Sequence, residues 1–370
     1  MEITLDITDL ARSGAGVGRN AAGQVVFVPF TAPGDQVRVE ILFQDKRYAE
    51  GRVLEILTSS ADRVVPPCPA FGRCGGCEWQ HLPYERQWQA KRSGLVHALK
   101  RVEVHTENIS WQEYPAERVW EYRNRIQLRG QGNSIGFYER GSKKLVPIEK
   151  CWIARPELNE RITSARDAGS ARPREYKLEL EVFPDGEVTE SWNSGHSALG
   201  FRQVHDEQNE KLIQWVSAHA GQGGTLLDLY GGSGNLSQGI AARFQEVHCV
   251  DVGAPAQPQS TTPIHFHFQR SDVLGWLKRE HIRLRSSPTP FHLILDPPRE
   301  GLGEDLGAIV EVLKTLPVQE TLLIGCEPDP WARALHRFQK HGWDLRSLGA
   351  LDFFPQTHHV EALAVLRKDR

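Results

Sequence analysis

The chain has 370 residues, of which 39% are hydrophobic and 25% charged, and its formal net charge is −3. The length predicts two or three domains of ordinary globular composition, and the absence of a run of 18 apolar residues excludes a membrane-spanning helix. Because the charge is close to neutral, contact with nucleic acid would have to depend on local charge. The first residues, Met1-Glu2-Ile3-Thr4, lack a secretory pattern and predict a cytoplasmic protein.

Residues 1–60 carry the alternation and the turn residues of short β-strands. Apolar residues alternate with polar ones at 3–7 and 37–41, and apolar runs occupy 25–30 and 51–57. The turns between them contain Gly14-Ala15-Gly16, Ala22-Gly23 and Pro33-Gly34-Asp35. Strands at this spacing predict a small five-stranded barrel. Such barrels often bind oligonucleotides, although the fold alone does not establish binding.

Three cysteines follow the barrel at C-x5-C-x2-C spacing: Cys68, Cys74 and Cys77. In a cytosolic chain, thiols this close together predict metal ligands before disulfides. Cys151 is the nearby candidate for a fourth ligand, whereas Cys249 falls in an expected core strand and is interpreted as a small buried side chain. Four thiolates suit zinc or a 4Fe–4S cluster, and the lack of a second C-x2-C pair favours the cluster.

The middle of the chain combines basic and aromatic residues. A helical pattern covers 83–102 and a strand is expected at 119–128. The window 117–150 has eight basic residues against four acidic ones, a net charge of +4, with aromatic side chains at Trp120, Tyr122, Phe137 and Tyr138. Basic groups attract phosphates and aromatic faces stack on unpaired bases, so the window indicates RNA binding through Arg123, Arg125 and Arg129. A solvated strand face explains it equally well.

The stretch 226–235, Leu-Leu-Asp-Leu-Tyr-Gly-Gly-Ser-Gly-Asn, predicts a strand that ends in a tight turn, and the amphipathic run 236–244 predicts the start of a helix. Glycines allow the backbone to approach a ligand closely. Asp251 ends the next strand, where a carboxylate can accept hydrogen bonds from ribose hydroxyls. The turn is not GxGxxG and no GK[ST] follows it, which disfavours dinucleotides and favours S-adenosylmethionine.

Strands and helices alternate over the rest of the chain. A helix is expected at 210–219, strands at 264–268, 291–295 and 321–325, and a proline-rich loop at 253–263. This order predicts an open, mainly parallel sheet with its ligands at the carboxyl ends of the strands. Asp296 and Cys326 follow two of these strands and should share one cleft with the glycine turn, and Asp272, near the end of a third, could lie beside the adenine.

Taken together, these residues resemble the family of RNA uridine-5-methyltransferases that carry a 4Fe–4S cluster. Segments 14–19 and 27–35 are similar to the TRAM domain, an RNA-binding barrel. The likeness continues through the cysteine motif, Tyr122-Arg123-Asn124, Phe201-Arg202-Gln203-Val204, the turn at 228–235, Asp296-Pro297-Pro298-Arg299 and Cys326. The resemblance implies a TRAM-like barrel at 1–60, a central domain at 61–200 with the cluster and RNA-binding strands, and a doubly wound, Rossmann-like methyltransferase domain at 201–370.

The resemblance also implies a role for each candidate residue. S-adenosylmethionine and its surroundings would involve Gln203, Tyr230, Asn235, Asp251, Asp272 and Asp296. The 4Fe–4S cluster would be held by Cys68, Cys74, Cys77 and Cys151. Cys326 would be the nucleophile and Glu361 the base. The chain departs from the family pattern at Gly231, where cysteine is usual, at His205, and at Gly325 and Glu327 beside the nucleophile.

Methylation of uracil at carbon 5 requires one thiol and one carboxylate, which Cys326 and Glu361 would supply from separate strand ends. Thiolate attack at carbon 6 makes carbon 5 nucleophilic, and a base then removes the carbon 5 proton. The expected substrate is RNA, with 23S rRNA favoured over tRNA, and the expected state is a monomer without membrane contact. Two alternatives stay open: an RNA-binding protein that has lost catalysis, and a small-molecule methyltransferase, which leaves the barrel unexplained.

Overall fold

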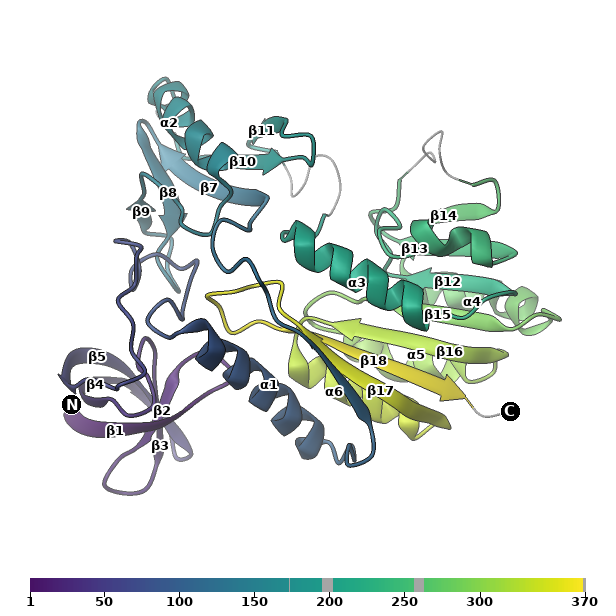
Figure 1. Ribbon diagram of the computed structural model, residues 1–370, viewed down its shortest axis with the longest axis horizontal. Coiled ribbons are helices and arrows are strands. Elements are labelled where there is room, and N and C mark those ends of the chain that lie inside the picture. The colour runs from purple at the N-terminus through teal and green to yellow at the C-terminus, as the bar shows by residue number, and fades with distance from the viewer. Residues whose placement is uncertain (173, 195–201, 256–262, 369–370) are drawn as a thin grey trace. The chain divides into compact units, whose positions relative to one another are not determined.

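The computed structural model describes residues 1–172, 174–194, 202–255 and 263–368 (Figure 1). The chain forms two compact units, one of Met1–Gly94, Glu117–Ala198 and Phe354–His358, the other of Leu95–Ala116, Leu199–Phe353 and His359–Arg370. These units differ from the consecutive segments 1–60, 61–200 and 201–370 expected from the sequence. The reason is that residues 95–116 contribute a strand to the sheet of the second unit, and Phe354–His358 packs with the first.

The first unit begins with the expected barrel, which is closed and five-stranded in the order β1-β2-β3-β5-β4 (Figure 1). Its strands are β1 (Glu2–Leu10), β2 (Gly16–Arg19), β3 (Val25–Val28), β4 (Gln36–Gln44) and β5 (Tyr48–Thr58). The alternate residues that point inward form its core: Leu5, Ile7, Val26, Val28, Val37, Val39 and Ala49. At Gly51 an added Cβ would lie 2.3 Å from a Val39 methyl carbon, so only glycine fits this point of the barrel wall.

The first unit continues with a five-stranded antiparallel sheet in the order β11-β10-β7-β8-β9. Its strands are β7 (Arg125–Gln131), β8 (Ser134–Tyr138), β9 (Leu145–Pro147), β10 (Tyr176–Val182) and β11 (Val188–Trp192), and helix α2 (Pro156–Ser170) packs on it. The strand expected from residue 119 begins only at Arg125, because Glu121 has a left-handed backbone (φ 52°) that interrupts the extended run. Helix α1 (Tyr84–Arg101) agrees with the helix predicted at 83–102.

The second unit is built on an eight-stranded sheet in the order β14-β13-β12-β15-β16-β18-β17-β6. Its strands are β6 (Ser110–Tyr114), β12 (Thr225–Leu229), β13 (Glu246–Asp251), β14 (Phe266–Arg270), β15 (Phe291–Leu295), β16 (Val318–Gly325), β17 (Trp343–Leu351) and β18 (Glu361–Lys368). Strands β12 to β16 are parallel, whereas β18 runs antiparallel to both of its neighbours. The mainly parallel sheet is therefore confirmed.

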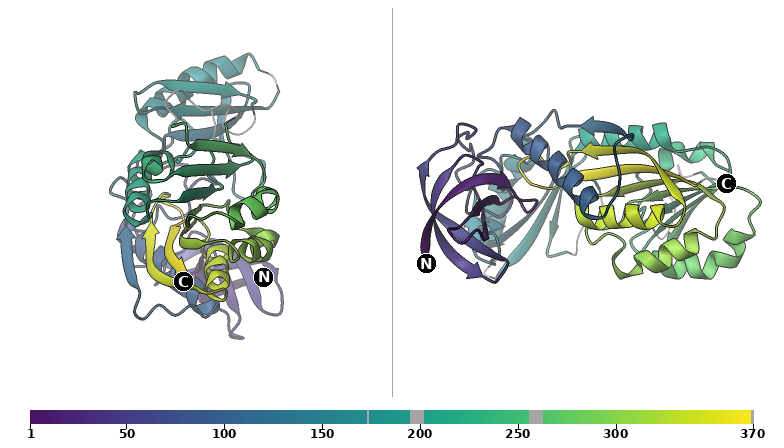
Figure 2. Two further views of the ribbon diagram at one scale, coloured as in Figure 1. Left: turned by 90° about the vertical axis from the view of Figure 1, so that its right-hand side faces the viewer. Right: turned by 90° about the horizontal axis from the view of Figure 1, so that it is seen from below.

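Helices cover both faces of this sheet (Figure 2). They are α3 (Asp206–His219), α4 (Val273–Arg285), α5 (Leu306–Leu313) and α6 (Pro328–Gln339), with short 3₁₀ helices η1 (Gln238–Arg243) and η2 (Gly303–Asp305). The run 236–244, expected to start a helix, forms only the 3₁₀ helix η1. Just before it, the Ser237 hydroxyl donates a hydrogen bond to buried Asp228. Most of the proline-rich loop at 253–263 lies outside the described residues. Among the described helices, none is long and apolar enough to cross a membrane.

Candidate active site and cysteine pocket

The carboxyl edge of the second unit's sheet brings the candidate nucleophile and base together. Cys326 directly follows β16, and Glu361 is the first residue of β18. Because β18 is antiparallel to β16 and pairs Gly325 with Ala362, its first residue lies at the edge where β16 ends. Asp296 follows β15, the other neighbour of β16, so strand pairing alone gathers one thiol and two carboxyl groups.

Burial and like charge dominate the electrostatics of this edge. Burial raises the pKa of the Cys326 thiol, and Glu361 and Asp296 raise it further, while Arg299 opposes them. Burial also raises the pKa of Glu361 well above its usual range, with Asp296 adding to the effect. The pKa of Asp296 rises to about 7, mainly through burial and secondly through Asp228. Burial and like charge therefore shift both Cys326 and Glu361 toward their protonated forms in the free protein.

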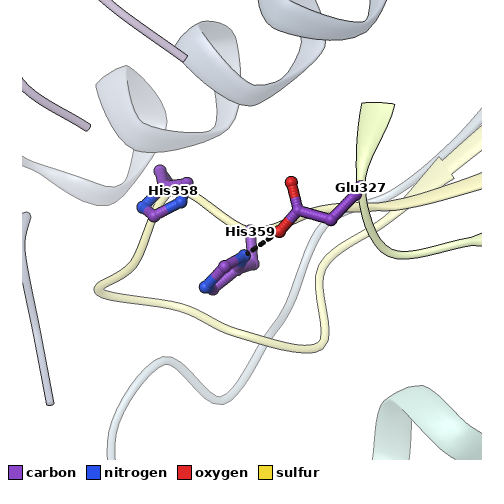
Figure 3. A group of neighbouring side chains, drawn as sticks. All are labelled: Glu327, His358 and His359. Carbon is purple, nitrogen blue, oxygen red and sulfur yellow. Dashed lines mark ion pairs between the residues drawn. The ribbon is translucent and has the colours of Figure 1, made fainter. Parts of the chain in front are cut away.

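Counter-charge at this edge comes from a short row of side chains that the sequence did not single out as functional. His359 Nδ1 lies 3.1 Å from a Glu327 carboxylate oxygen, the ion pair drawn in Figure 3. Arg299 Nη2 lies 3.4 Å from Nε2 of the same histidine. Glu327 directly follows Cys326, and Arg299 directly follows the Asp296-Pro297-Pro298 turn, so their positions in the sequence were the signal that could have found them.

The glycine turn places a carboxylate where a ribose could meet it. Tyr230, Gly232 and Gly234 all have positive φ, which makes the turn tight. Asp251 is oriented by two backbone donors, the N–H of Gly232 at 3.2 Å and that of Gly253 at 2.6 Å. Burial, followed by the charges of Asp305, Asp272 and Asp251, raises the pKa of Tyr230 to about 12.

The other cofactor candidates are spread along the same edge. Asp272 caps α4 by accepting the N–H of Gly275 at 2.6 Å. The amide of Asn235 exchanges two hydrogen bonds, of 2.8 and 3.1 Å, with Asn209 on α3. Gln203 is nearly buried just before α3. Tyr230, Asp251 and Asp272 thus form one group, whereas Asn235 is bound toward α3.

Asp228 is a buried carboxyl group for which the sequence predicted no role beyond its place in a strand. It is wholly buried and accepts a hydrogen bond from the Ser237 hydroxyl. Burial raises its pKa to about 6. The signal was present in the sequence, since an acid within an apolar strand must be either paired or protonated.

Four of the six cysteines line one pocket of the first unit. Cys68, Cys74, Cys77 and Cys151 surround a cavity of about 220 Å³ and are free thiols. Backbone N–H groups face two of the sulfurs, Gly76 at Cys74 and both Ile153 and Ala154 at Cys151. Burial raises the pKa of Cys74 to about 11, and the neighbouring sulfurs raise it further. Four thiols around one space, with N–H donors aimed at them, fit a soft metal centre. Cys249 lies apart, fully buried in β13 as expected.

Only some of the basic and aromatic side chains in the window 117–150 are exposed at the surface. Arg125 is 8% exposed, and its Nη1 lies 4.0 Å from Glu181, which is also buried. Tyr122 is 2% exposed, and its hydroxyl donates to the Pro355 carbonyl. The side chain of Arg125 is therefore buried beside a carboxylate in this structure, whereas the expectation of RNA binding assumed an exposed side chain. Lys143 and Lys144, between β8 and β9, are exposed.

Comparison with known proteins extends these observations. A family model described as the TRAM domain matches residues 1–54. An uncharacterized RNA methyltransferase of Bdellovibrio bacteriovorus is 32% identical over 100% of this chain and 95% of its own length. The 23S rRNA (uracil(1939)-C(5))-methyltransferase RlmD of Shewanella amazonensis is 30% identical over 98% of this chain and 95% of its own.

A solved structure of similar fold covers nearly the whole chain. It is the Pyrococcus abyssi tRNA (uracil-54, C5)-methyltransferase in complex with S-adenosyl-L-homocysteine, with a TM-score of 0.71 and 21% identity over 98% of this chain and 99% of that one. Together with the full-length relatives, the TRAM barrel and the thiol beside a carboxyl group at the strand edge, this similarity leads to one conclusion. The chain belongs to the family of RNA uracil-C5 methyltransferases.

Proposed function

We propose that this protein transfers a methyl group from S-adenosylmethionine to carbon 5 of a uridine in 23S rRNA through a covalent cysteine adduct. The named bacterial relatives favour ribosomal RNA as the substrate. Transfer RNA is the second candidate substrate, since the structure of similar fold belongs to a tRNA methyltransferase. With either substrate the protein would work in the cytoplasm, where we propose that it acts as a monomer.

The observation that carries this proposal is the pairing of β16 with β18. It sets Cys326 and Glu361 at one edge of the sheet, close enough for the carboxyl group to raise the pKa of the thiol. A nucleophile and a base that act on adjacent ring carbons of one pyrimidine must lie this close. A target base in folded RNA would have to leave its stack to reach them.

The chemistry assigns one step to each group. The Cys326 thiolate forms a bond to carbon 6, and the electron pair of the carbon 5–carbon 6 double bond moves into the ring to give an enolate. Carbon 5 then takes the methyl group, for which S-adenosylmethionine is the donor. Glu361 removes the proton at carbon 5, the double bond re-forms and the thiolate leaves. A base must be ionised to accept a proton. Because burial raises the pKa of Glu361 in the free protein, Glu361 would have to lose its proton before it acts on the adduct.

Residues at the carboxyl edge would hold the methyl donor. Asp251, which accepts hydrogen bonds from the Gly232 and Gly253 N–H groups, would accept hydrogen bonds from the ribose hydroxyls. Tyr230 and Asp272 beside it would border the adenosine. Gln203, Asn235 and Asp296 complete the proposed set.

We further propose that Cys68, Cys74, Cys77 and Cys151 ligate a 4Fe–4S cluster. The four free thiols, their shared cavity and the N–H donors around them support this assignment. When bound, the cluster would link the 68–77 loop covalently to the segment that follows β9. Metal binding would then be coupled to folding, because both segments must be in place to supply the four ligands.

A methylation assay tests the proposed function. Purified protein, labelled S-adenosylmethionine and separate transcripts of 23S rRNA and tRNA should give 5-methyluridine in the ribosomal RNA. Label in tRNA alone would move the substrate to the second candidate. Binding of RNA without label in either transcript would favour a protein that has lost catalysis.

A further inference from the structure

Arg123, which the sequence suggested as an RNA ligand, has its side chain in the cysteine pocket. It lines the same cavity as Cys68, Cys74, Cys77 and Cys151. Its Nε–H donates to the Arg125 carbonyl at 3.0 Å. Its backbone N–H donates to Ile153, and its carbonyl accepts from Arg155. These bonds fix the residue against the segment that follows Cys151.

The Arg123 guanidinium is a permanent charge on the Cys151 side of this pocket. Arg123 forms a β-bridge with Ala154, three residues after Cys151, and lines the same cavity as that cysteine. No carboxylate lies within ion-pair distance of Arg123 among the residues that the structure describes. Lys150 also lines the pocket, but its ammonium pairs with Glu121 at 3.1 Å and 43% of its side chain is exposed.

Neutral donors serve the opposite side of the pocket. Gln80 is 3% exposed, and its carbonyl oxygen accepts the N–H of Cys68 at 3.4 Å while its amide bonds to the Cys77 thiol. Gly76 serves Cys74 through its backbone N–H. The loop sulfurs therefore have neutral partners, and the full positive charge is concentrated at Cys151.

We propose that Arg123 is the charge partner of the metal centre and raises its reduction potential. The proposal depends on the 4Fe–4S assignment made above. A cluster held by four thiolates is an anion, and one-electron reduction makes it more negative. A fixed cation beside it stabilises the reduced form more than the oxidised form, since net charge and nearby donors set the potentials of such clusters.

Three substitutions in the full chain, purified without oxygen, test this role. Arg123→Met removes the charge but keeps most of the apolar stem, and Arg123→Lys keeps the charge. Arg129→Met is the matched control, because Arg129 stands over the Tyr138 ring and does not line the pocket. Iron is counted first, and the midpoint potential is then measured with dithionite as the reductant and electron paramagnetic resonance as the readout.

We expect a lower potential for Arg123→Met, and a potential close to that of the wild type for Arg123→Lys and Arg129→Met. Ferricyanide gives a second readout that does not require reduction of the cluster. The visible absorption of Arg123→Met should be lost several-fold faster, because an uncompensated cluster is more easily oxidised. Unchanged potential and unchanged loss for Arg123→Met would overturn the proposal.

Failure of the 4Fe–4S assignment can be distinguished from failure of the role proposed for Arg123. Wild-type protein without iron would reject the 4Fe–4S assignment itself. Wild-type protein that holds iron, with Arg123→Met unaltered in both readouts, would reject only the role of Arg123. If Arg123→Met does not retain iron, Arg123→Lys decides, since wild-type behaviour supports the role of charge and loss of iron contradicts it.

Discussion

The two groups of buried sulfur in this protein differ in the charges around them. The described residues that line the cysteine pocket include the cations Arg123 and Lys150 and no acid. Cys326 instead has Glu361, Asp296 and Glu327 beside it, with Arg299 as the opposing charge. Burial raises the pKa of thiols in both places, but the neighbouring charges differ: cations line the cysteine pocket, whereas carboxyl groups surround Cys326.

This difference corresponds to two kinds of chemistry. A metal ligand must stay deprotonated, so cations and N–H donors around it are useful. A nucleophile that forms a transient adduct must also leave, and carboxyl groups around it keep it protonated until a substrate is bound. Each prediction below alters one side of this comparison.

The largest expected effect is on iron binding. Wild-type protein purified without oxygen should contain about four irons per chain, and Cys151→Ala should lose most of them because one thiolate ligand is missing. Metal analysis checks this. Cys249→Ala is the matched control and should keep its iron, since Cys249 lies in β13 of the other unit. Zinc in place of iron in the wild type would contradict the assignment.

The second prediction concerns the pH dependence of adduct formation. Since burial and the neighbouring carboxyl groups raise the pKa of Cys326, the thiolate fraction is small near neutral pH and should grow about tenfold per pH unit. Adduct formation with RNA that contains 5-fluorouridine should rise accordingly between about pH 6 and pH 9.

Glu361→Gln sharpens this pH test. Where Glu361 is ionised, its charge raises the pKa of Cys326, and the neutral side chain in Glu361→Gln cannot do so. Over that pH range the rise in adduct formation should therefore lie at lower pH in the variant than in the wild type. A flat profile in the wild type, or a shift to higher pH in the variant, would show that these carboxyl groups do not control the thiol.

The smallest effect is expected on RNA affinity. Replacing exposed Lys143 and Lys144 together with alanine should weaken binding several-fold and flatten its salt dependence by roughly 0.7 for each phosphate that is no longer neutralised. Filter binding at several salt concentrations measures this. The control pair is Lys314 and Lys340. These two lysines directly follow helices α5 and α6 of the second unit. Equal losses of affinity in both pairs would indicate a nonspecific effect of charge.

Much of this architecture was predictable because its signals are local. Alternating apolar residues indicated the barrel, and acids or a cysteine after buried strands indicated the carboxyl edge. Other features depend on which strands become neighbours. Nothing in Ser110–Tyr114 indicates that it pairs with β17, and the placement of Glu361 beside Cys326 requires the antiparallel β18. Arg123 and Arg125 appeared exposed because their sequence window is basic, yet Arg125 is buried on β7 and Arg123 lines the cysteine pocket.

The measurement that tests the central claim most directly is the fate of the covalent complex in Glu361→Gln. If Cys326 attacks carbon 6 and Glu361 removes the carbon 5 proton, this variant should complete methyl transfer and then stall. Labelled methyl should appear in a protein–RNA band that survives denaturing electrophoresis, and Cys326→Ala should give no such band. A band without label would place Glu361 before methyl transfer, and methylation by Cys326→Ala at the wild-type rate would contradict the account.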